Sequence, residues 1–230
     1  LSEIDDAVDR IIAGMEGTPL VDGRSKRLIA YHEVGHALIG SLVKDHDPVQ
    51  KVTVIPRGQA QGLTWFSPDD DQTLISRSQL KARIMGALGG RAAEDIVFGR
   101  EEATTGAGGD VQMVASMARQ MVTRFGMSSL GPVSLEGDSQ EVFVGRSLMN
   151  TSDISDEISK QIDEQVRSIV KKCYEEALEL VAENRSAMDK LVEILIEKET
   201  MEGEEFCQIL SDYTLIPEKD RFIPALKDPK

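Results

Sequence analysis

Positive charge is in short supply in this chain. Its 230 residues include 26 Lys and Arg against 40 Asp and Glu, which leaves a formal net charge of -14. Binding to nucleic-acid phosphates needs clustered Lys and Arg, and so does docking on an anionic membrane surface. The composition therefore argues against a nucleic-acid partner and against electrostatic docking on a membrane.

Cysteines and long apolar runs are also scarce. Cys173 and Cys207 are the only two thiols, and both lie in helical patterns, which favours packed thiols over a disulfide bridge between them. No apolar run approaches the roughly 18 residues of a membrane-spanning helix, and no signal peptide opens the chain. The chain itself is therefore expected to be soluble. Because it does not begin with Met, we expect a piece of a longer protein whose membrane anchor could lie elsewhere.

Helical periodicity dominates what the sequence does contain. Helical patterns run over residues 3–13, 25–43, 76–98, 110–125, 153–184, 185–199 and 203–213. Two short β-branched and aromatic stretches, KVTVIP and GLTWF, are typical of strands joined by a turn. Residues 127–152 are expected to be irregular, and the tail from Pro217 to be loosely held. The predicted fold class is mainly α, with a small β element near 51–66 next to the helix of 25–43.

One helical stretch, AYHEVGHALIG at residues 30–40, holds two of the chain's three histidines. Residues four apart share a helix face, so His32 and His36 can direct both imidazoles at one metal ion, with zinc the default. Glu33 points about 100° round the helix from His32, which suits it to hold a water on that metal. As general base it would take the water's proton and pass it to a leaving amine, which is peptide hydrolysis. The alternative is a chance motif on ordinary core or surface histidines.

A catalytic zinc needs a third protein ligand. The metzincin pattern is excluded, because Ile39 and Leu42 stand where that pattern has Gly and His. Thermolysin-like enzymes are excluded as well, because no Glu occurs between Val34 and Ala93 to serve as their downstream ligand. The third ligand therefore has to come from elsewhere in the chain.

Three residues are candidates for that third ligand. His46 follows the helix closely, in what is expected to be a solvated loop. Glu94 lies in a helical pattern three residues after Arg91, so an ion pair within the helix is its alternative role. Asp110 lies where a glycine-rich loop meets a helix, and its alternative role is a helix N-cap. Spacing alone does not choose among the three.

Five blocks follow one another along the chain: YHEVGHAL, KVTVIPRGQAQGLTWF, LGGRAAEDIVFG, TTGAGGD and ARQMVTRFGMS. In that order they resemble the protease domain of the FtsH family of ATP-dependent, membrane-anchored zinc metalloproteases. The stretches RGQAQGLTWF and TTGAGGD are most similar to its cyanobacterial and chloroplast branch. The resemblance implies a zinc metalloprotease domain over 19–215, the end of an AAA+ module with a linker in 1–18, and a C-terminal tail in 216–230.

The resemblance also implies a role for individual residues. It implies zinc bound by His32, His36 and Asp110, a catalytic Glu33, and a Glu94 that orients a ligand histidine. Glycines before Asp110 would let this loop bend into a crowded site, so we expect an Asp110 oxygen about 2.0–2.2 Å from zinc.

The cofactors and partners implied by the resemblance extend beyond zinc. ATP and magnesium would bind only in an ATPase module absent from this chain, which has no G-x-x-x-x-G-K-[ST] stretch. The implied substrates are unfolded or membrane proteins, and the implied assembly is a homo- or hetero-hexamer. The native protein would be anchored in a thylakoid or plasma membrane, with this domain on the stromal or cytoplasmic side.

A protease of low sequence specificity is expected to bind the substrate backbone as an added strand. The best candidate edge is GLTWF, because its glycine allows close approach and the rest are strand formers: Gly62, Leu63, Thr64, Trp65 and Phe66. The alternative is a strand that merely covers the core.

A second functional interpretation is a helical assembly module that has kept a metal site and lost catalysis. The acidic helices after Asp153 carry apolar residues that could pack on their own domain or between subunits: Ile158, Ile162, Val166, Ile169 and Val170. Glu33 favours the enzyme, because an inactive relative is expected to lack the base or a ligand.

Overall fold

The computed structural model describes residues 23–57, 61–67, 74–135 and 155–218. Its elements are α2 (Gly23–Leu42), β1 (Val49–Thr53), β2 (Leu63–Phe66), α3 (Arg77–Phe98), the 3-10 turn η1 (Arg100–Glu102), α4 (Gly108–Thr123), α5 (Asp156–Glu183), α6 (Arg185–Lys198), β3 (Thr200–Glu202) and α7 (Gly203–Ser211). The mainly α prediction is confirmed, and the predicted helix at 3–13 lies outside the described residues. The six predicted helices within them are all present, with ends shifted by up to three residues.

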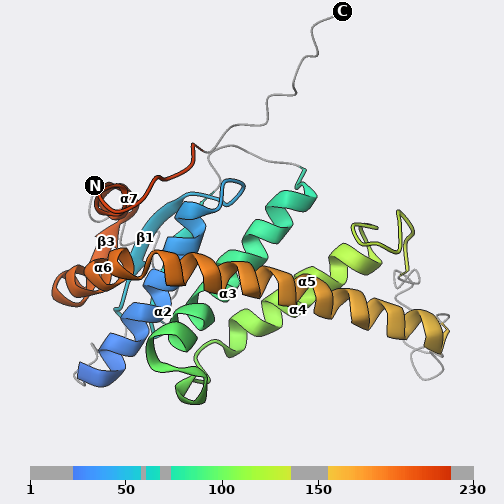
Figure 1. Ribbon diagram of the computed structural model, residues 1–230, viewed down its shortest axis with the longest axis horizontal. Helices are drawn as coiled ribbons and strands as arrows, with labels where there is room; N and C mark the ends of the chain where they lie inside the picture. The colour runs from blue at the N-terminus through green and yellow to red at the C-terminus, as the bar shows by residue number, and fades with distance from the viewer. Residues whose placement is uncertain (1–22, 58–60, 68–73, 136–154, 219–230) are drawn as a thin grey trace, which may run out of the picture.

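Helix α2 lies at the centre of the fold (Figure 1). It packs against α3 along one side, against α6 and α5 elsewhere, and against strands β1 and β2 on the face opposite α3. The long α5 crosses α3 and α4 and covers them. Every residue of α2 from Ile29 to Ser41 is buried as a result, including four that can ionise.

Two glycines set the separation of α2 and α3. A Cβ built on Gly35 would stand 2.5 Å from the carbonyl oxygen of Gly89, and a Cβ on Gly89 would stand 2.5 Å from that of Gly35. Any larger side chain at either position would therefore push the two helix backbones apart. This close approach brings side chains of α3 next to the histidines of α2.

The sheet has the strand order β2-β1-β3, with β1 antiparallel to both neighbours. Val52 of β1 pairs with Thr64 on one side and with Met201 on the other. Strand β3 was not predicted, because it is a three-residue strand between two helices that only its pairing with β1 defines. Within the described residues, the outer edge of β2 has no partner strand.

The two thiols agree with the expectation from composition. Cys173 and Cys207 are free; Cys173 is buried, and Cys207 packs against the core. Among the described helices, none combines the length and the apolar character that a bilayer crossing requires.

Candidate active site

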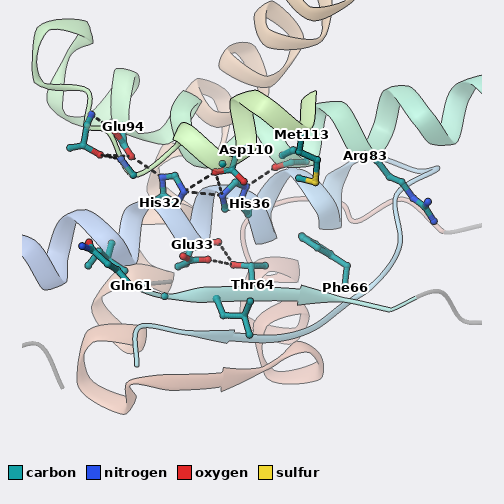
Figure 2. A pocket seen from close by; sticks show the side chains of 18 of the residues that line it. His32, Glu33, His36, Gln61, Thr64, Phe66, Arg83, Glu94, Asp110 and Met113 are labelled. Carbon is teal, nitrogen blue, oxygen red and sulfur yellow. Dashed lines mark hydrogen bonds and ion pairs between the residues drawn. The ribbon is translucent and has the colours of Figure 1, made fainter. Parts of the chain in front are cut away.

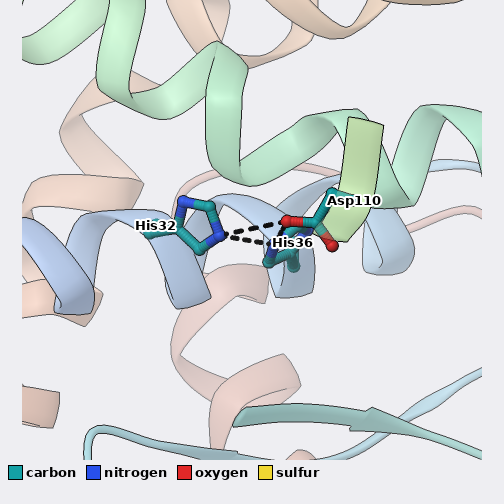
Figure 3. A group of neighbouring side chains, drawn as sticks. All are labelled: His32, His36 and Asp110. Atoms are coloured by element: carbon teal, nitrogen blue, oxygen red, sulfur yellow. Dashed lines mark hydrogen bonds and ion pairs between the residues drawn. The ribbon is translucent and has the colours of Figure 1, made fainter. Parts of the chain in front are cut away.

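Two histidines of α2 and one aspartate of α4 converge on a single point (Figure 3). The Nε2 atoms of His32 and His36 are 3.0 Å apart. Asp110 Oδ2 lies 3.4 Å from His32 Nε2 and 3.6 Å from His36 Nε2. Ligand atoms of a tetrahedral zinc site, each about 2.0–2.1 Å from the metal, are separated by about 3.3 Å. The triangle therefore has the size that such an ion requires.

Hydrogen bonds on the far side of each ring fix the orientation of both imidazoles. His32 Nδ1 lies 2.7 Å from Glu94 Oε1, and His36 Nδ1 lies 2.8 Å from the carbonyl oxygen of Gly86. Since both of these partners only accept, each Nδ1 carries a proton, and the neutral form of each ring, which is the form that binds a metal, has its Nε2 lone pair on the side of Asp110. Three such electron-pair donors side by side repel one another unless a cation lies among them, so the donor set fits a metal.

Electrostatics at this centre favour positive charge. Burial disfavours the charged form of His32, yet hydrogen bonds with Asp110 and Glu94 and the charge of Glu33 outweigh it and raise the pKa of His32 to about 10. Burial would raise the pKa of Asp110, but hydrogen bonds with His32 and His36 hold that pKa well below its ordinary value. A metal has to compete with the proton on His32, so metal affinity falls as the pH is lowered.

Glu94 contacts the ring of His32 on the side away from the point where the three donor atoms converge. Its side chain is buried and also accepts hydrogen bonds from the Thr104 backbone N–H at 2.7 Å and from the Thr104 hydroxyl at 3.2 Å. Burial opposes ionisation, but the bonds from His32 and Thr104 lower the pKa of Glu94. The alternative of an Arg91–Glu94 ion pair is wrong, because Arg91 pairs with Asp95 at 3.2 Å.

Asp110 lies in the first turn of α4, on the wall of a cavity. The alternative role of Asp110 as a helix N-cap is wrong, because Ala107 occupies the N-cap position of α4 and no side chain caps the helix there. The reason expected for the glycines before Asp110 is wrong for two of the three, since a Cβ would meet another group closely only at Gly106, where Thr104 Oγ1 lies at 3.2 Å. A Cβ on Gly108 or Gly109 would meet nothing within 4 Å, so the space there would admit larger residues.

The turn before His46 is exposed at Lys44 and Asp45, as predicted, but His46 itself is not. Its ring is buried and packs against the Phe66 ring at 4.5 Å between centroids. Its Nδ1 lies 2.8 Å from the carbonyl oxygen of Asp47, and its Nε2 lies against the backbone of Gly86. His46 is not part of the group of converging donors and instead helps to wall the cavity.

Glu33 points away from the two histidines, toward β2 (Figure 2). Its Oε2 accepts a 2.8 Å hydrogen bond from the Thr64 hydroxyl, and it does not belong to the group of converging donors. Burial raises the pKa of Glu33, while the two histidines and the bond from Thr64 lower it by less. The carboxylate therefore ionises at a higher pH than an exposed glutamate and takes up a proton more readily, which suits a general base.

These side chains line a cavity of about 790 Å³ between α2, α3, α4 and β2. Four of the five predicted substrate-strand residues contribute to its wall: Gly62, Leu63, Thr64 and Phe66. Trp65 does not; it pairs with Lys51 in the sheet. The cavity thus has the metal-binding group on one wall and the free edge strand on another.

Sequence reasoning missed one glycine of the site. A Cβ on Gly90 would stand 2.6 Å from His36 Nε2 and 2.7 Å from His32 Nε2, in the space where the two rings meet. Glycine disfavours a helix interior by about 1 kcal/mol relative to alanine. The run GALGG inside a predicted helix was therefore the available signal that another group comes close to this backbone.

Comparison with known families supports the same interpretation. The model of peptidase family M41 matches residues 19–209. The chain belongs to peptidase family M41. It is 54% identical over 220 residues to the "ATP-dependent zinc metalloprotease FtsH" of Trieres chinensis, covering 95% of this chain and 34% of that protein. It is 57% identical over 219 residues to "ATP-dependent zinc metalloprotease FTSH 8, chloroplastic" of Arabidopsis thaliana, covering 95% of this chain and 32% of that protein.

A third relative is "ATP-dependent zinc metalloprotease FTSH 2, chloroplastic" of Oryza sativa subsp. japonica, 57% identical over 224 residues, or 97% of this chain and 33% of that protein. The chain thus spans about a third of the length of these relatives. The predicted FtsH-type metalloprotease domain is confirmed, and the chloroplastic relatives agree with the predicted branch.

Proposed function

We propose that this M41 domain is an endopeptidase that binds zinc through His32, His36 and Asp110 and uses Glu33 as its general base. The proposal rests on the arrangement of these four residues, three of which converge while the fourth lies apart. Three of them turn donor atoms to one point within 3.6 Å of each other. The fourth is held apart, on the substrate side of the same helix.

Each protein group then has a defined task. Zinc, when bound, supplies the Lewis acidity that polarises a carbonyl and makes water acidic. Glu33 takes a proton from the attacking water at its carboxylate and delivers it to the leaving amine. Glu94 and the Gly86 carbonyl hold the two histidine rings in the tautomer and orientation that metal binding needs.

The edge strand β2 is the proposed substrate-binding element. Its outer edge is free in the part of the chain that the structure describes, so an extended peptide can add to the sheet as a further strand. The alternative, a strand that only covers the core, is less favoured because all four residues of β2 keep partial exposure and three of them face the cavity. Substrate selection would then rest mainly on backbone hydrogen bonds.

The longer protein is proposed from its relatives. Their names describe ATP-dependent zinc metalloproteases, two of them chloroplastic. We infer a membrane-anchored hexamer that degrades unfolded or membrane proteins, in a thylakoid or plasma membrane, with this domain on the stromal or cytoplasmic side. In it, residues 1–18 would form the end of an ATP- and magnesium-binding AAA+ module and a linker, 19–215 the protease domain and 216–230 a tail.

The catalytically inactive assembly module is the less favoured function. Apolar residues of α5 that could have served an interface pack on the core of this domain: Ile162, Val166, Ile169 and Val170. The convergence of His32, His36 and Asp110 and the contact of Glu33 with Thr64 support the enzyme instead. Packing of α5 on its own domain therefore accounts for these side chains without an assembly role.

The substitution Glu33→Gln tests the proposal. It should leave zinc content and folding unchanged, because Glu33 lies outside the metal-binding group, and lower casein cleavage by about 10²- to 10⁴-fold through loss of the proton acceptor. Glu101→Gln, the same change at an exposed residue, is the matched control. Metal analysis and a digestion assay with and without chelator provide the readout. Cleavage by Glu33→Gln at near the parent rate would overturn the mechanism.

A further inference from the structure

The general base proposed above makes its closest polar side-chain contact with a strand. Thr64 Oγ1 lies 2.8 Å from Glu33 Oε2 and 2.9 Å from the backbone oxygen of the same glutamate. Thr64 belongs to the edge strand β2, 31 residues further along the chain. Figure 2 shows the two side chains facing each other across the gap between helix and strand.

Gly62, the residue just before β2, also limits where the carboxylate can go. Gly62 has no side chain, and a Cβ there would stand 2.8 Å from both Cγ and Oε1 of Glu33. The start of β2 therefore lies directly against one side of the glutamate, while Thr64 holds the oxygen on the other. With only 7% of Glu33 exposed, solvent contributes little to its orientation.

We propose that Thr64 is a positioning residue for the reaction: its hydroxyl holds the Glu33 carboxylate in the orientation that meets the water. The proposal rests on the proposed role of Glu33 as general base. A glutamate has three rotatable side-chain bonds, and a misplacement of about 1 Å at a reacting group can cost about 100-fold in rate. Thr64 removes this freedom with one hydrogen bond to a charged acceptor.

A hydroxyl suits this position because its single proton can serve either acceptor. It donates to Oε2 while the carboxylate is ionised. Once Glu33 has taken the proton from water, the hydroxyl can turn that donation to the backbone oxygen at 2.9 Å and accept from the protonated carboxyl. Thr64 thus keeps its contact with Glu33 before and after the proton moves, with no displacement of heavy atoms.

The position of Thr64 also connects substrate binding with the base. Its side chain faces α2, while the backbone of β2 offers the free edge on which a peptide would pair. The two roles are separable, because the hydroxyl contacts the base and the backbone contacts the substrate. Loss of the hydroxyl should therefore lower kcat and leave KM for a peptide substrate nearly unchanged.

Thr64→Val, which removes the hydroxyl and keeps the shape, tests this in the 230-residue chain with a fluorogenic peptide. We expect kcat to fall about 10- to 100-fold, the factor that corresponds to losing a hydrogen bond to a charged group. KM and zinc content should stay within about twofold, since kcat and KM report different interactions. Thr64→Ser, which restores the hydroxyl, should recover most of the rate. Near-parent kcat in Thr64→Val, or Thr64→Ser as slow as Thr64→Val, would overturn the proposal.

A double variant separates this role from general damage to the fold. In a Glu33→Gln background, Thr64→Val should leave the residual rate unchanged, because the group it positions is gone. An equal fall in both backgrounds shows an effect that does not act through Glu33 and ends the proposal. Full activity of Glu33→Gln alone would instead refute the general base itself, which distinguishes the two failures. Circular dichroism spectra identify variants that fail to fold, and Thr64→Ala then replaces Thr64→Val in the same comparison.

Discussion

Helices α2 and α5 differ in how much of their surface is buried. From Ile29 to Ser41, α2 has thirteen consecutive buried residues, whereas only four of the 28 residues of α5 are buried: Ile162, Cys173, Ala177 and Val181. A helix with one apolar stripe shows its packing face in its sequence period. A helix buried all round shows no face, so its polar residues carry the information, because each of them must find a partner.

The partners of the polar groups differ accordingly. On α2, His32, Glu33 and His36 are each satisfied by a group from α3, α4 or β2. On α5, Lys171 pairs with Glu175 one turn away in the same helix, at 3.7 Å. Chemistry at α2 therefore depends on the tertiary structure, whereas α5 has pairs such as Lys171–Glu175 that need only their own helix, beside an exposed pair of its Asp163 with Arg119 of α4.

The strongest test of this contrast is Asp110→Asn, which alters a partner that α4 supplies to α2. We expect zinc affinity to fall by more than about 100-fold, since residues that merely orient a ligand already cost about 10- to 100-fold. Casein cleavage should be lost with the metal. Competition against a chromogenic chelator measures the affinity.

His46→Ala is the matched control, because this histidine lines the same cavity without joining the metal group. It should keep zinc but lower stability, since the ring fills buried space beside Phe66 and Gly86. Loss of zinc from His46→Ala with zinc retained in Asp110→Asn would reverse the ligand assignment.

Gly90→Ala places a methyl group where the two imidazoles meet, 2.6 Å from His36 Nε2. The rings must shift, so we expect a loss of zinc affinity of about 10- to 100-fold, comparable to the loss of a ligand-orienting residue. Folding stability should change little, because alanine favours the helix by up to about 1 kcal/mol and the displaced atoms are side-chain ends. Unchanged zinc affinity would contradict the placement of the His32 and His36 rings against Gly90.

Gly89→Ala tests the contact between the helix backbones. Its Cβ would meet the Gly35 carbonyl at 2.5 Å, so the helices must separate. We expect a loss of about 1–3 kcal/mol from overpacking, partly offset by helix propensity of up to about 1 kcal/mol. Urea unfolding measures it, with Gly108→Ala as control, since a Cβ there meets nothing within 4 Å. A Gly89→Ala variant more stable than the parent contradicts the close approach.

The smallest effect is expected on α5. Lys171→Ala removes an exposed pair with Glu175 and should cost about 0.2–0.5 kcal/mol, with no change in cleavage or zinc content. The same urea titration applies. A loss of activity in this variant would mean that this face of α5 takes part in function, and the contrast with α2 would no longer hold.

Several features of this protein were predictable from relations between residues that are close together in the sequence. Residues four apart share a helix face whatever the rest of the chain does, so His32 and His36 were predicted as a pair and Glu33 as lying off their face. The amphipathic helices and the strands near 51–66 follow from equally short-range periods. The resemblance to a known family then selected Asp110, which spacing alone could not do.

Tertiary structure decided the partners, because these depend on segments far apart in the chain. His32 and Glu94 are 62 residues apart, His36 and Gly86 are 50 apart, and Glu33 and Thr64 are 31 apart. No local period encodes such contacts, and β3 likewise exists only through its pairing with β1. The burial of His46 and the glycine contact between α2 and α3 arise in the same way. The sequence thus specified which groups carry the chemistry, and packing between distant segments specified how each group is held, because close-packed interiors fix side chains through their neighbours in space.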